Sequence, residues 1–196
     1  MTSTPASGLR SMTRDAVRAQ IAAVAIDLFA EHGFDQVTVE QIATASGISA
    51  RSFHRYFPAK EDAVIGDTTV WAELVRDTLD QRPTDESPWE SLRAAFGELL
   101  ARSDGDRDRQ RRTMRVLSST PSLRARNLEK HLMWARMFAP IVEERLDGDH
   151  VELRAQALVQ SALVCFDLAL TTWADSQDDT SPVDYLALAF ATVGPR

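Results

Sequence analysis

The stretch that decides the fold runs from Thr38 to Lys60 and reads TVEQIATASGISARSFHRYFPAK. Thr38 and Gln41 have the spacing of a capping box, in which each side chain satisfies the backbone amide of the other residue at the start of a helix. Gly47 lies further along, and glycine is the residue that most readily makes a tight turn. The first half of the stretch therefore predicts a short helix that begins at Thr38 and ends at a turn around Gly47.

A second short helix is predicted between Ser49 and Phe57. Serine is a preferred residue at the start of a helix, and Pro58 disfavours helical geometry in the residue that precedes it. Two short helices joined by a turn that contains glycine form a helix-turn-helix, which places its second helix in the major groove of DNA. We therefore interpret the stretch as an element that reads double-stranded DNA.

Polar and basic side chains make up the surface that this element would present to DNA. Arg51, near the start of the second helix, is the best candidate for a bidentate contact with a guanine edge. Phe53 and Phe57 fit a small apolar core instead. The predicted DNA contacts are Thr38, Ser49, Arg51, Ser52, His54, Tyr56 and Lys60. The alternative is a solvated helix pair whose polar residues only cap and solubilise it.

The distribution of charge agrees with DNA binding by the N-terminal part. The chain of 196 residues carries a formal net charge of −7. Residues 1–60 hold six basic and five acidic residues, whereas the rest of the chain holds 16 basic and 24 acidic ones. No acidic residue lies between positions 41 and 60. A local positive face can therefore bind phosphates although the whole protein is acidic.

The chain before this element predicts a tail and one helix. An apolar stripe with helical spacing runs through residues 12–31, and Gly33 is a suitable C-terminal cap. Residues 1–11 have the composition of a disordered tail. Arg10 and Arg14 would either reach phosphates or the minor groove, or belong to a tail without function.

The chain after this element is expected to be helical throughout, because no segment shows the alternation of a strand. Pro140 should kink or divide the helix that contains it. Expected helices span about residues 59–82, 87–102, 106–118, 121–146, 151–175 and 181–193. The fold class is therefore all-α with about nine helices. The expected parts are the tail at 1–11, a three-helix DNA-binding domain at 12–58, and a ligand-binding and dimerisation domain at 59–196.

Apolar and aromatic residues of the C-terminal part predict a pocket for a small apolar ligand. Such a pocket between helices needs an apolar lining and a few polar groups. Predicted lining residues are Phe96, Leu100, Met114, Leu117, Trp134, Phe138, Phe166 and Trp173. A plain packed core is the alternative for each of them.

Two further features of the C-terminal part suggest binding surfaces. The basic segment from Arg107 to Arg115 is either a solvated face or an attraction for a phosphate-bearing ligand such as coenzyme A. Arg115 itself would contact an anionic group of a ligand or form a surface salt bridge. The helices at 151–175 and 181–193 are apolar on more than one face, so we expect them to form a four-helix homodimer interface with a second copy.

Composition disfavours several classes of protein. The single cysteine excludes an internal disulfide framework, and the four histidines show no zinc-ligand spacing. No apolar run approaches the roughly 20 residues of a membrane span, and the first residues lack the apolar core of a signal peptide, which favours a cytoplasmic protein. No catalytic motif or cofactor site is apparent. An enzyme is the second hypothesis, and a helical interaction module without DNA binding is the third.

The pattern of residues 14–65 resembles the TetR family of transcriptional regulators. His54 stands where that family usually has tyrosine, and Ala59 stands where serine or asparagine often caps the next helix. Tyr56 stands where histidine or tyrosine is usual. The matching positions are Thr38, Val39, Ile42, Ala43, Ala45, Gly47, Ile48, Ser49, Ser52, Phe53, His54, Tyr56, Phe57, Lys60 and Glu61.

The resemblance implies a homodimeric, ligand-responsive repressor that binds a palindromic operator. Two copies of the second helix would enter successive major grooves about 34–36 Å apart. A ligand would release the DNA through a shift of the helix at 59–82. Residues 119–146, STPSLRARNLEKHLMWARMFAPIVEERL, are similar to a subgroup whose C-terminal domain binds acyl-CoA. This second resemblance implies a fatty-acyl thioester or a similar ligand.

Overall fold

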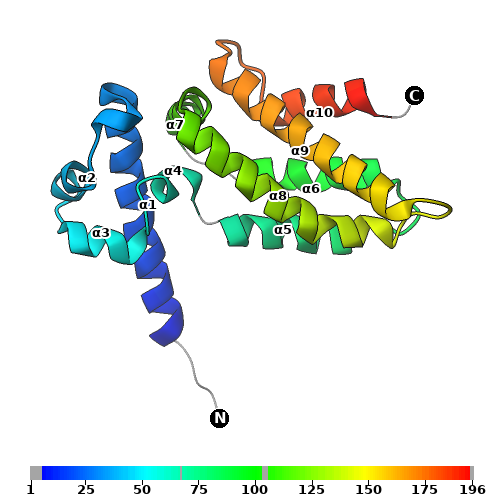
Figure 1. Ribbon diagram of the computed structural model, residues 1–196, viewed down its shortest axis with the longest axis horizontal. Helices are drawn as coiled ribbons and strands as arrows, with labels where there is room; N and C mark the ends of the chain where they lie inside the picture. The colour runs from blue at the N-terminus through cyan, green and yellow to red at the C-terminus, as the bar shows by residue number, and fades with distance from the viewer. Residues whose placement is uncertain (1–5, 67, 103–105, 195–196) are drawn as a thin grey trace. The chain divides into compact units, whose positions relative to one another are not determined.

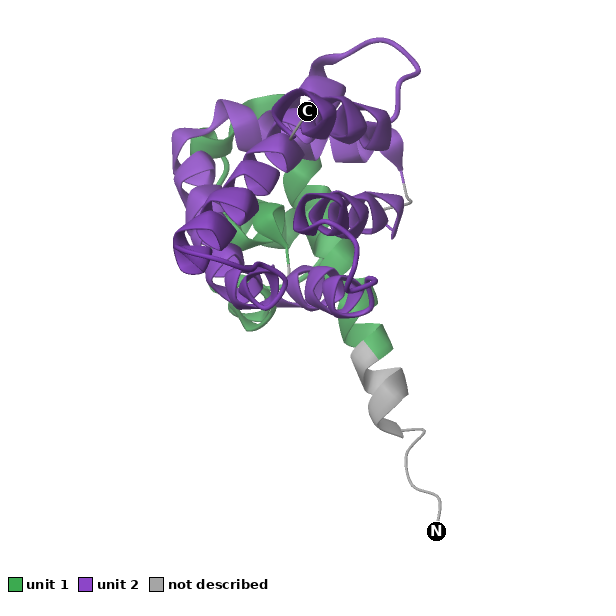
Figure 2. Ribbon diagram, turned by 90° about the vertical axis from the view of Figure 1, so that its right-hand side faces the viewer, with its two compact units in different colours: residues 1–66 green, residues 67–196 purple. Residues whose placement is uncertain are grey.

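Every regular element in the part of the chain that the structure describes is a helix, as predicted (Figure 1). The structure is a computed structural model, and it describes residues 6–66, 68–102 and 106–194. The elements are α1 (Ala6–His32), the 3-10 helix η1 (Phe34–Gln36), α2 (Val39–Ala45), α3 (Ala50–Tyr56), α4 (Asp62–Ile65), α5 (Thr68–Asp80), α6 (Pro88–Arg102), α7 (Arg107–Ser119), α8 (Pro121–Glu143), α9 (Val151–Asp175) and α10 (Pro182–Val193). The chain divides into two compact units, residues 1–66 and 67–196 (Figure 2).

The first unit packs α1 to α4 around a small aromatic core. The rings of Phe29 and Phe34 lie 4.8 Å apart, and those of Phe53 and Phe57 lie 5.4 Å apart. All four side chains are buried, which confirms the core role predicted for Phe53 and Phe57. Helix α1 begins at Ala6, so the predicted tail is too long at its C-terminal end. The first five residues of that tail, and the side chain of Arg10, lie outside the described residues.

The prediction of a single helix over residues 59–82 is wrong. The structure has two helices there, α4 and α5, with Gly66 after the first of them. Gly66 has a φ of +76°, a value that a right-handed helix does not contain, so α4 ends at this residue. Helix α4 packs against α1. It therefore belongs to the first unit, and the division between units falls after Gly66 rather than after residue 58.

The second unit is a helical bundle built around α9. This helix contacts α6, α7, α8 and α10, and α5 packs against α6 and α8. Phe96 lies at the centre of the core, with its ring 5.0 Å from that of Phe166 and 6.3 Å from that of Phe138. Helix α8 continues through Pro140 to Glu143, so the proline does not divide it.

Helix α9 is more apolar than the sequence analysis expected. It contains an 18-residue window with a mean hydropathy of 1.4, which is long and apolar enough to cross a membrane. From the sequence we expected no segment of the chain to pass that test of length and composition. Its apolar residues include Ala155, Val159, Ala162 and Phe166, all buried against the rest of the bundle. Packing on several sides accounts for these buried residues, whereas Val164 and Leu168 of the same helix are exposed.

A polar network fixes the connection between α5 and α6. Arg82 forms an ion pair with Glu86, which also accepts a hydrogen bond of 2.7 Å from the Ser91 hydroxyl. Arg145, beyond the end of α8, donates to the same hydroxyl at 3.0 Å and to the carbonyl oxygen of Leu79. The network joins three segments of the second unit through charge-assisted hydrogen bonds.

Candidate DNA-binding surface and ligand cavity

The turn between α2 and α3 has the hydrogen bonds of a Schellman motif. The amide of Ile48 donates to the carbonyl of Ala43 at 2.9 Å, and the amide of Gly47 donates to that of Thr44 at 3.1 Å. Gly47 has a φ of +69°, the left-handed conformation that this motif requires. The turn therefore sets the direction in which α3 leaves α2.

The predicted caps of both helices are present. The amide of Thr38 donates to Gln41 Oε1 at 2.8 Å, and the amide of Gln41 donates to Thr38 Oγ1 at 3.3 Å, which completes the capping box. Ser49 caps α3 by accepting from the amide of Ser52 at 3.1 Å. Its hydroxyl also lies 3.0 Å from the Ser52 hydroxyl. These predicted DNA contacts thus serve first to shape the element.

Helix α3 presents a basic face to solvent. Arg51, His54 and Arg55 are exposed, whereas Phe53 between them is buried. The Arg55 guanidinium lies 5.4 Å from the centre of the Tyr56 ring. Together with Thr13 and Arg14 of α1, Arg55 and Tyr56 line a shallow pocket of about 320 Å³. The predicted contact set omitted Arg55, although its position four residues after Arg51 places it on the same helix face.

The ring of His54 is oriented by a carbonyl group at the end of α3. Its Nδ1 lies 3.2 Å from the carbonyl oxygen of Pro58. A carbonyl oxygen can only accept, so Nδ1 carries the hydrogen and Nε2 of the neutral ring is left as an acceptor. A phosphate would therefore receive a hydrogen bond from His54 only when the imidazole is protonated.

Lys60 does not extend into solvent. Its ammonium donates to the carbonyl oxygens of Phe34 at 2.8 Å and Val37 at 3.0 Å. It also lies 4.3 Å from the centre of the Phe34 ring. The residue predicted to hold a phosphate is therefore a partly buried link between the segment after α1 and the start of α4.

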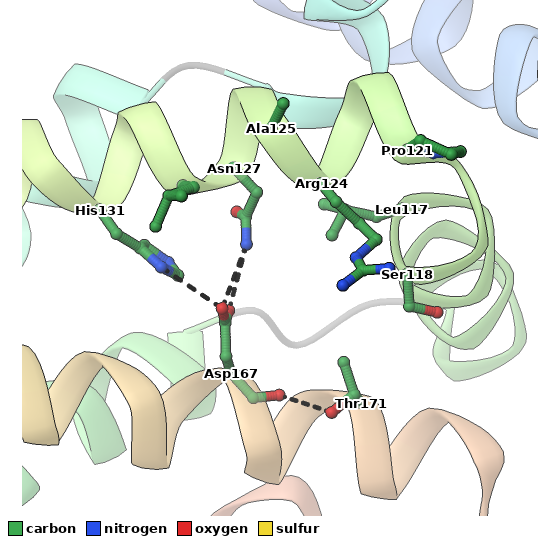
Figure 3. Close-up of a pocket in the computed structure, with 10 residues that line it drawn as sticks. Leu117, Ser118, Pro121, Arg124, Ala125, Asn127, His131, Asp167 and Thr171 are labelled. Carbon is green, nitrogen blue, oxygen red and sulfur yellow. Dashed lines mark hydrogen bonds and ion pairs between the residues drawn. The ribbon is translucent and has the colours of Figure 1, made fainter.

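The predicted ligand-lining residues lie mostly in packed core. Phe96, Leu100, Trp134, Phe138 and Phe166 belong to one buried cluster, in which the Phe96 ring contacts the Phe166 ring and the Trp134 ring contacts the Phe138 ring. Trp173 is also buried, and Met114 is half-buried. Of the predicted residues, Leu117 alone lines the cavity of about 620 Å³ between α7, α8 and α9 (Figure 3).

Sequence reasoning missed the polar end of this cavity. Asn127 and His131 point from α8 toward Asp167 on α9 (Figure 3). Asn127 Nδ2 lies 3.3 Å from both carboxylate oxygens, and His131 Nδ1 lies 3.3 Å from one of them. Asn127 and His131 are four residues apart, which places them on one helix face. A polar pair with this spacing on an otherwise apolar face is the signal that the sequence offered.

Burial shifts the ionisation of this cluster. Burial, followed by repulsion from Lys130, lowers the pKa of His131 to about 3, so the imidazole is neutral. Burial raises the pKa of Asp167, while Lys130 and the bond from Asn127 oppose that rise. Lys130 is itself desolvated, which lowers its pKa to about 8. Its ammonium lies 4.9 Å from the centre of the Trp134 ring.

The basic segment of α7 joins that helix to the end of α9. Arg115 Nε donates to the carbonyl oxygen of Ala174 at 2.9 Å. Arg111 donates to the carbonyl oxygen of Ser176, and its guanidinium lies 4.9 Å from the centre of the Trp173 ring. Carbonyl groups at a helix C-terminus need such donors. Arg115 Nε also lies 3.9 Å from Asp175 Oδ1, which is the surface salt bridge that was the predicted alternative to a ligand contact.

Apolar side chains are exposed along α9 and α10. Val164 is 58% exposed and Leu168 is 54% exposed on α9, and Leu188 of α10 is 66% exposed. Val164 and Leu168 also line a groove of about 540 Å³ with Ala189 and Val193 of α10. The two helices predicted to form a dimer interface therefore share an apolar surface.

Comparisons with known proteins agree with this architecture. Residues 21–64 match the family model for bacterial regulatory proteins of the tetR family, and residues 86–196 match the model for the MftR C-terminal domain. MftR of Mycobacterium tuberculosis, named as a mycofactocin biosynthesis transcriptional regulator, is 30% identical over 174 residues, which are 89% of this chain and 87% of that protein. The HTH-type transcriptional regulator TcmR of Streptomyces glaucescens is 31% identical over 152 residues, which are 72% of this chain and 67% of that one.

Solved structures show the same fold at lower identity. FadR of Bacillus subtilis, in complex with stearoyl-CoA, has a TM-score of 0.60 and 21% identity, covering 88% of this chain and 95% of that one. NalD of Pseudomonas aeruginosa, a repressor of a multidrug efflux pump, has a TM-score of 0.58 and 19% identity, covering 91% and 96%. The helix-turn-helix, the bundle and the family matches together place this chain in the TetR family of transcriptional regulators, with a C-terminal domain of the MftR type.

Proposed function

We propose that this regulator is a repressor that reads a palindromic operator through α3. The observation that carries the proposal is the exposed basic face of α3. Arg51, His54 and Arg55 are exposed on this helix, whereas Phe53 is buried in the core. Arg51 reads a guanine, and the polar residues around it hold phosphates. Lys60 contributes by holding the element together, because its ammonium is already bonded to two carbonyl groups.

Operator binding involves a homodimer in this proposal. A palindromic site requires two copies of α3 related by two-fold symmetry. The apolar surface of α9 and α10 supports such an assembly, since exposed apolar patches of this kind mark interaction surfaces. The protein acts in the cytoplasm, where its DNA lies.

A small molecule in the second unit controls DNA binding. The fold shared with FadR, solved in complex with stearoyl-CoA, supports an acyl-CoA or a small apolar molecule as the effector. The cavity between α7, α8 and α9 is the site that we assign to the effector. The effector releases DNA by binding more tightly to a conformation that does not fit the operator.

Mobility-shift assays with the DNA upstream of the protein's own gene test the proposal. Wild type should retard a specific fragment, and Arg51→Ala should weaken that binding without unfolding the protein. Arg93→Ala is the matched control, because Arg93 is an exposed arginine of α6 in the second unit. Equal, sequence-independent binding by all three proteins would refute specific reading by α3. Titration of the complex with acyl-CoAs of several chain lengths tests the acyl-CoA alternative, and failure to release DNA would refute that alternative.

A further inference from the structure

The cavity between α7, α8 and α9 ends in two buried polar atoms that have no hydrogen-bond partner. They are Asn127 Oδ1 and His131 Nε2. Asn127 is 6% exposed and His131 is 8% exposed, and both residues line the cavity (Figure 3). A buried polar atom without a partner is costly. Such atoms at the end of a cavity indicate that a ligand supplies the missing bonds.

Both unpartnered atoms are hydrogen-bond acceptors. The Asp167 carboxylate accepts from Asn127 Nδ2, which leaves the amide oxygen of Asn127 as the free atom. The same carboxylate lies 3.3 Å from His131 Nδ1, so Nδ1 carries the hydrogen of the neutral ring and Nε2 has a lone pair. Asp167 therefore orients both neighbours so that their acceptor atoms, Asn127 Oδ1 and His131 Nε2, are left without a partner. The ligand must supply the donors.

The charges at the inner end of the cavity are those of Asp167 and Lys130, which interact favourably with each other. Arg124 is a further cation in the lining and is exposed. At the inner end itself, an anionic group would face two acceptor atoms and a carboxylate. An uncharged donor group avoids that repulsion.

The remaining lining sets the shape of the ligand. Apolar side chains from α7 and α8 form most of the wall, namely Leu117, Pro121, Ala125 and Leu128, and Ser118, Arg124 and Thr171 lie beside them. Leu128 is 60% exposed, so the wall reaches solvent while the polar end is buried. A ligand that enters polar end first would bury its donors and cover the wall with an apolar body.

We propose that this cavity binds an apolar molecule with neighbouring uncharged hydroxyl or N–H groups at its inner end, which donate to Asn127 Oδ1 and His131 Nε2. The inference rests on the proposed function, because it names the chemistry of the effector in that same site. It selects the small apolar molecule over the acyl-CoA, because a carboxylate or the carbonyl of a thioester offers only acceptors to this end of the cavity.

Three naphthalene probes of similar size test the inference by calorimetry with the full chain. 2,3-Dihydroxynaphthalene carries two neighbouring donors, 2,3-dimethoxynaphthalene carries only acceptors, and 2-naphthoate carries an anion. We expect the dihydroxy probe to bind more tightly than the other two probes. Its Kd should be lower by a factor of about ten for each hydrogen bond that the other probe cannot form. Equal or tighter binding of either other probe overturns the inference, and so does failure of the dihydroxy probe to bind at millimolar concentration.

Two variants locate the binding. Asn127→Leu and His131→Phe should each weaken the dihydroxy probe about tenfold and leave the dimethoxy probe unchanged. Ser91→Ala is the control, because Ser91 is a buried polar residue that does not line this cavity. Unchanged affinity of the dihydroxy probe in both cavity variants overturns the inference.

A measurement on the wild-type protein tests the inference even if the variants fail to fold. The ¹⁵N chemical shifts of the His131 ring should report a hydrogen on Nδ1 and none on Nε2, with Nε2 shifting when the dihydroxy probe binds. A hydrogen on Nε2 in the free protein overturns the inference. DNA binding by the unliganded protein is measured separately, so its absence would refute the regulatory proposal while the cavity result stands.

Discussion

The ammonium of Lys60 donates a hydrogen bond of 2.8 Å to the carbonyl oxygen of Phe34 and lies 4.3 Å from the centre of the ring of the same residue. Two interactions with one residue, and a third with the Val37 carbonyl, join segments that are more than 20 positions apart in the chain. Lys60 therefore contributes to DNA binding by holding the first unit together.

Lys60→Met should lower the free energy of unfolding by about 2–3 kcal/mol, because it removes two charge-assisted hydrogen bonds and a cation–π contact while keeping the apolar stem. Urea denaturation measures the change. Arg51→Met is the matched control, since Arg51 is exposed on α3 and should leave stability unchanged. If Lys60→Met reduced DNA affinity at unchanged stability, Lys60 would be a phosphate contact as the sequence predicted.

Substitution by alanine should change the stability of the protein in opposite directions at Gly47 and at Gly97. Gly47→Ala should destabilise by about 1–2 kcal/mol, because a side chain disfavours the left-handed conformation that the Schellman turn needs. Gly97→Ala should stabilise by about 0.5–1 kcal/mol, because Gly97 lies inside α6 and an added Cβ would meet nothing within 4 Å. Thermal unfolding of both variants tests this contrast. A stabilising effect at position 47 would contradict the turn assignment.

The ion pair between Arg82 and Glu86 should make stability depend on acidity. The guanidinium of Arg82 and the Ser91 hydroxyl lower the pKa of Glu86 to about 2, from an ordinary value of 4.5. A lowered carboxyl pKa gives stability that is fully present above the unfolded value and is lost as the pH falls through the folded one. The loss should therefore occur between about pH 5 and pH 2.

Glu86→Gln tests this pH dependence. Solvent screening reduces the contribution to about 1–2 kcal/mol. The free energy of unfolding of wild type should fall by that amount across the acid range. The free energy of unfolding of Glu86→Gln should be lower at neutral pH and should fall less on acidification. Denaturant titrations at several pH values measure the difference, with Glu90→Gln as a control for a carboxyl group outside the ion pair. Parallel curves for wild type and Glu86→Gln would show that the ion pair does not stabilise the fold.

Local rules predicted local features well. Thr38, Ser49 and Pro58 act through neighbours within a few positions, so their caps and helix ends follow from the sequence. Gly66 escaped notice because the helical pattern around it gave no reason to expect a positive φ. The spacing of Asn127 and His131 on α8 is a signal for the polar end of the cavity, but the sequence could not place Asp167 beside them. Asn127 and Asp167 are 40 positions apart, and only the packing of α8 on α9 brings them together.

The apolar surface of α9 and α10 supports a prediction about assembly. Leu168→Glu places a charge where a second copy would bury it without a partner, so the dimer should dissociate. Leu132→Glu is the matched control, since Leu132 is 49% exposed on α8 and does not line the groove between α9 and α10. Light scattering should give a dimer for wild type and the control, and a monomer for Leu168→Glu.

Dissociation should also weaken operator binding. A dimer binds the second half-site as an intramolecular event, so a monomer should lose affinity by a factor on the order of 100. The first unit of Leu168→Glu stays intact, because Leu168 lies in the second unit. Its binding to an isolated half-site should therefore match that of wild type. A monomeric wild type at micromolar concentration, or equal operator affinity in both proteins, would contradict recognition by a homodimer.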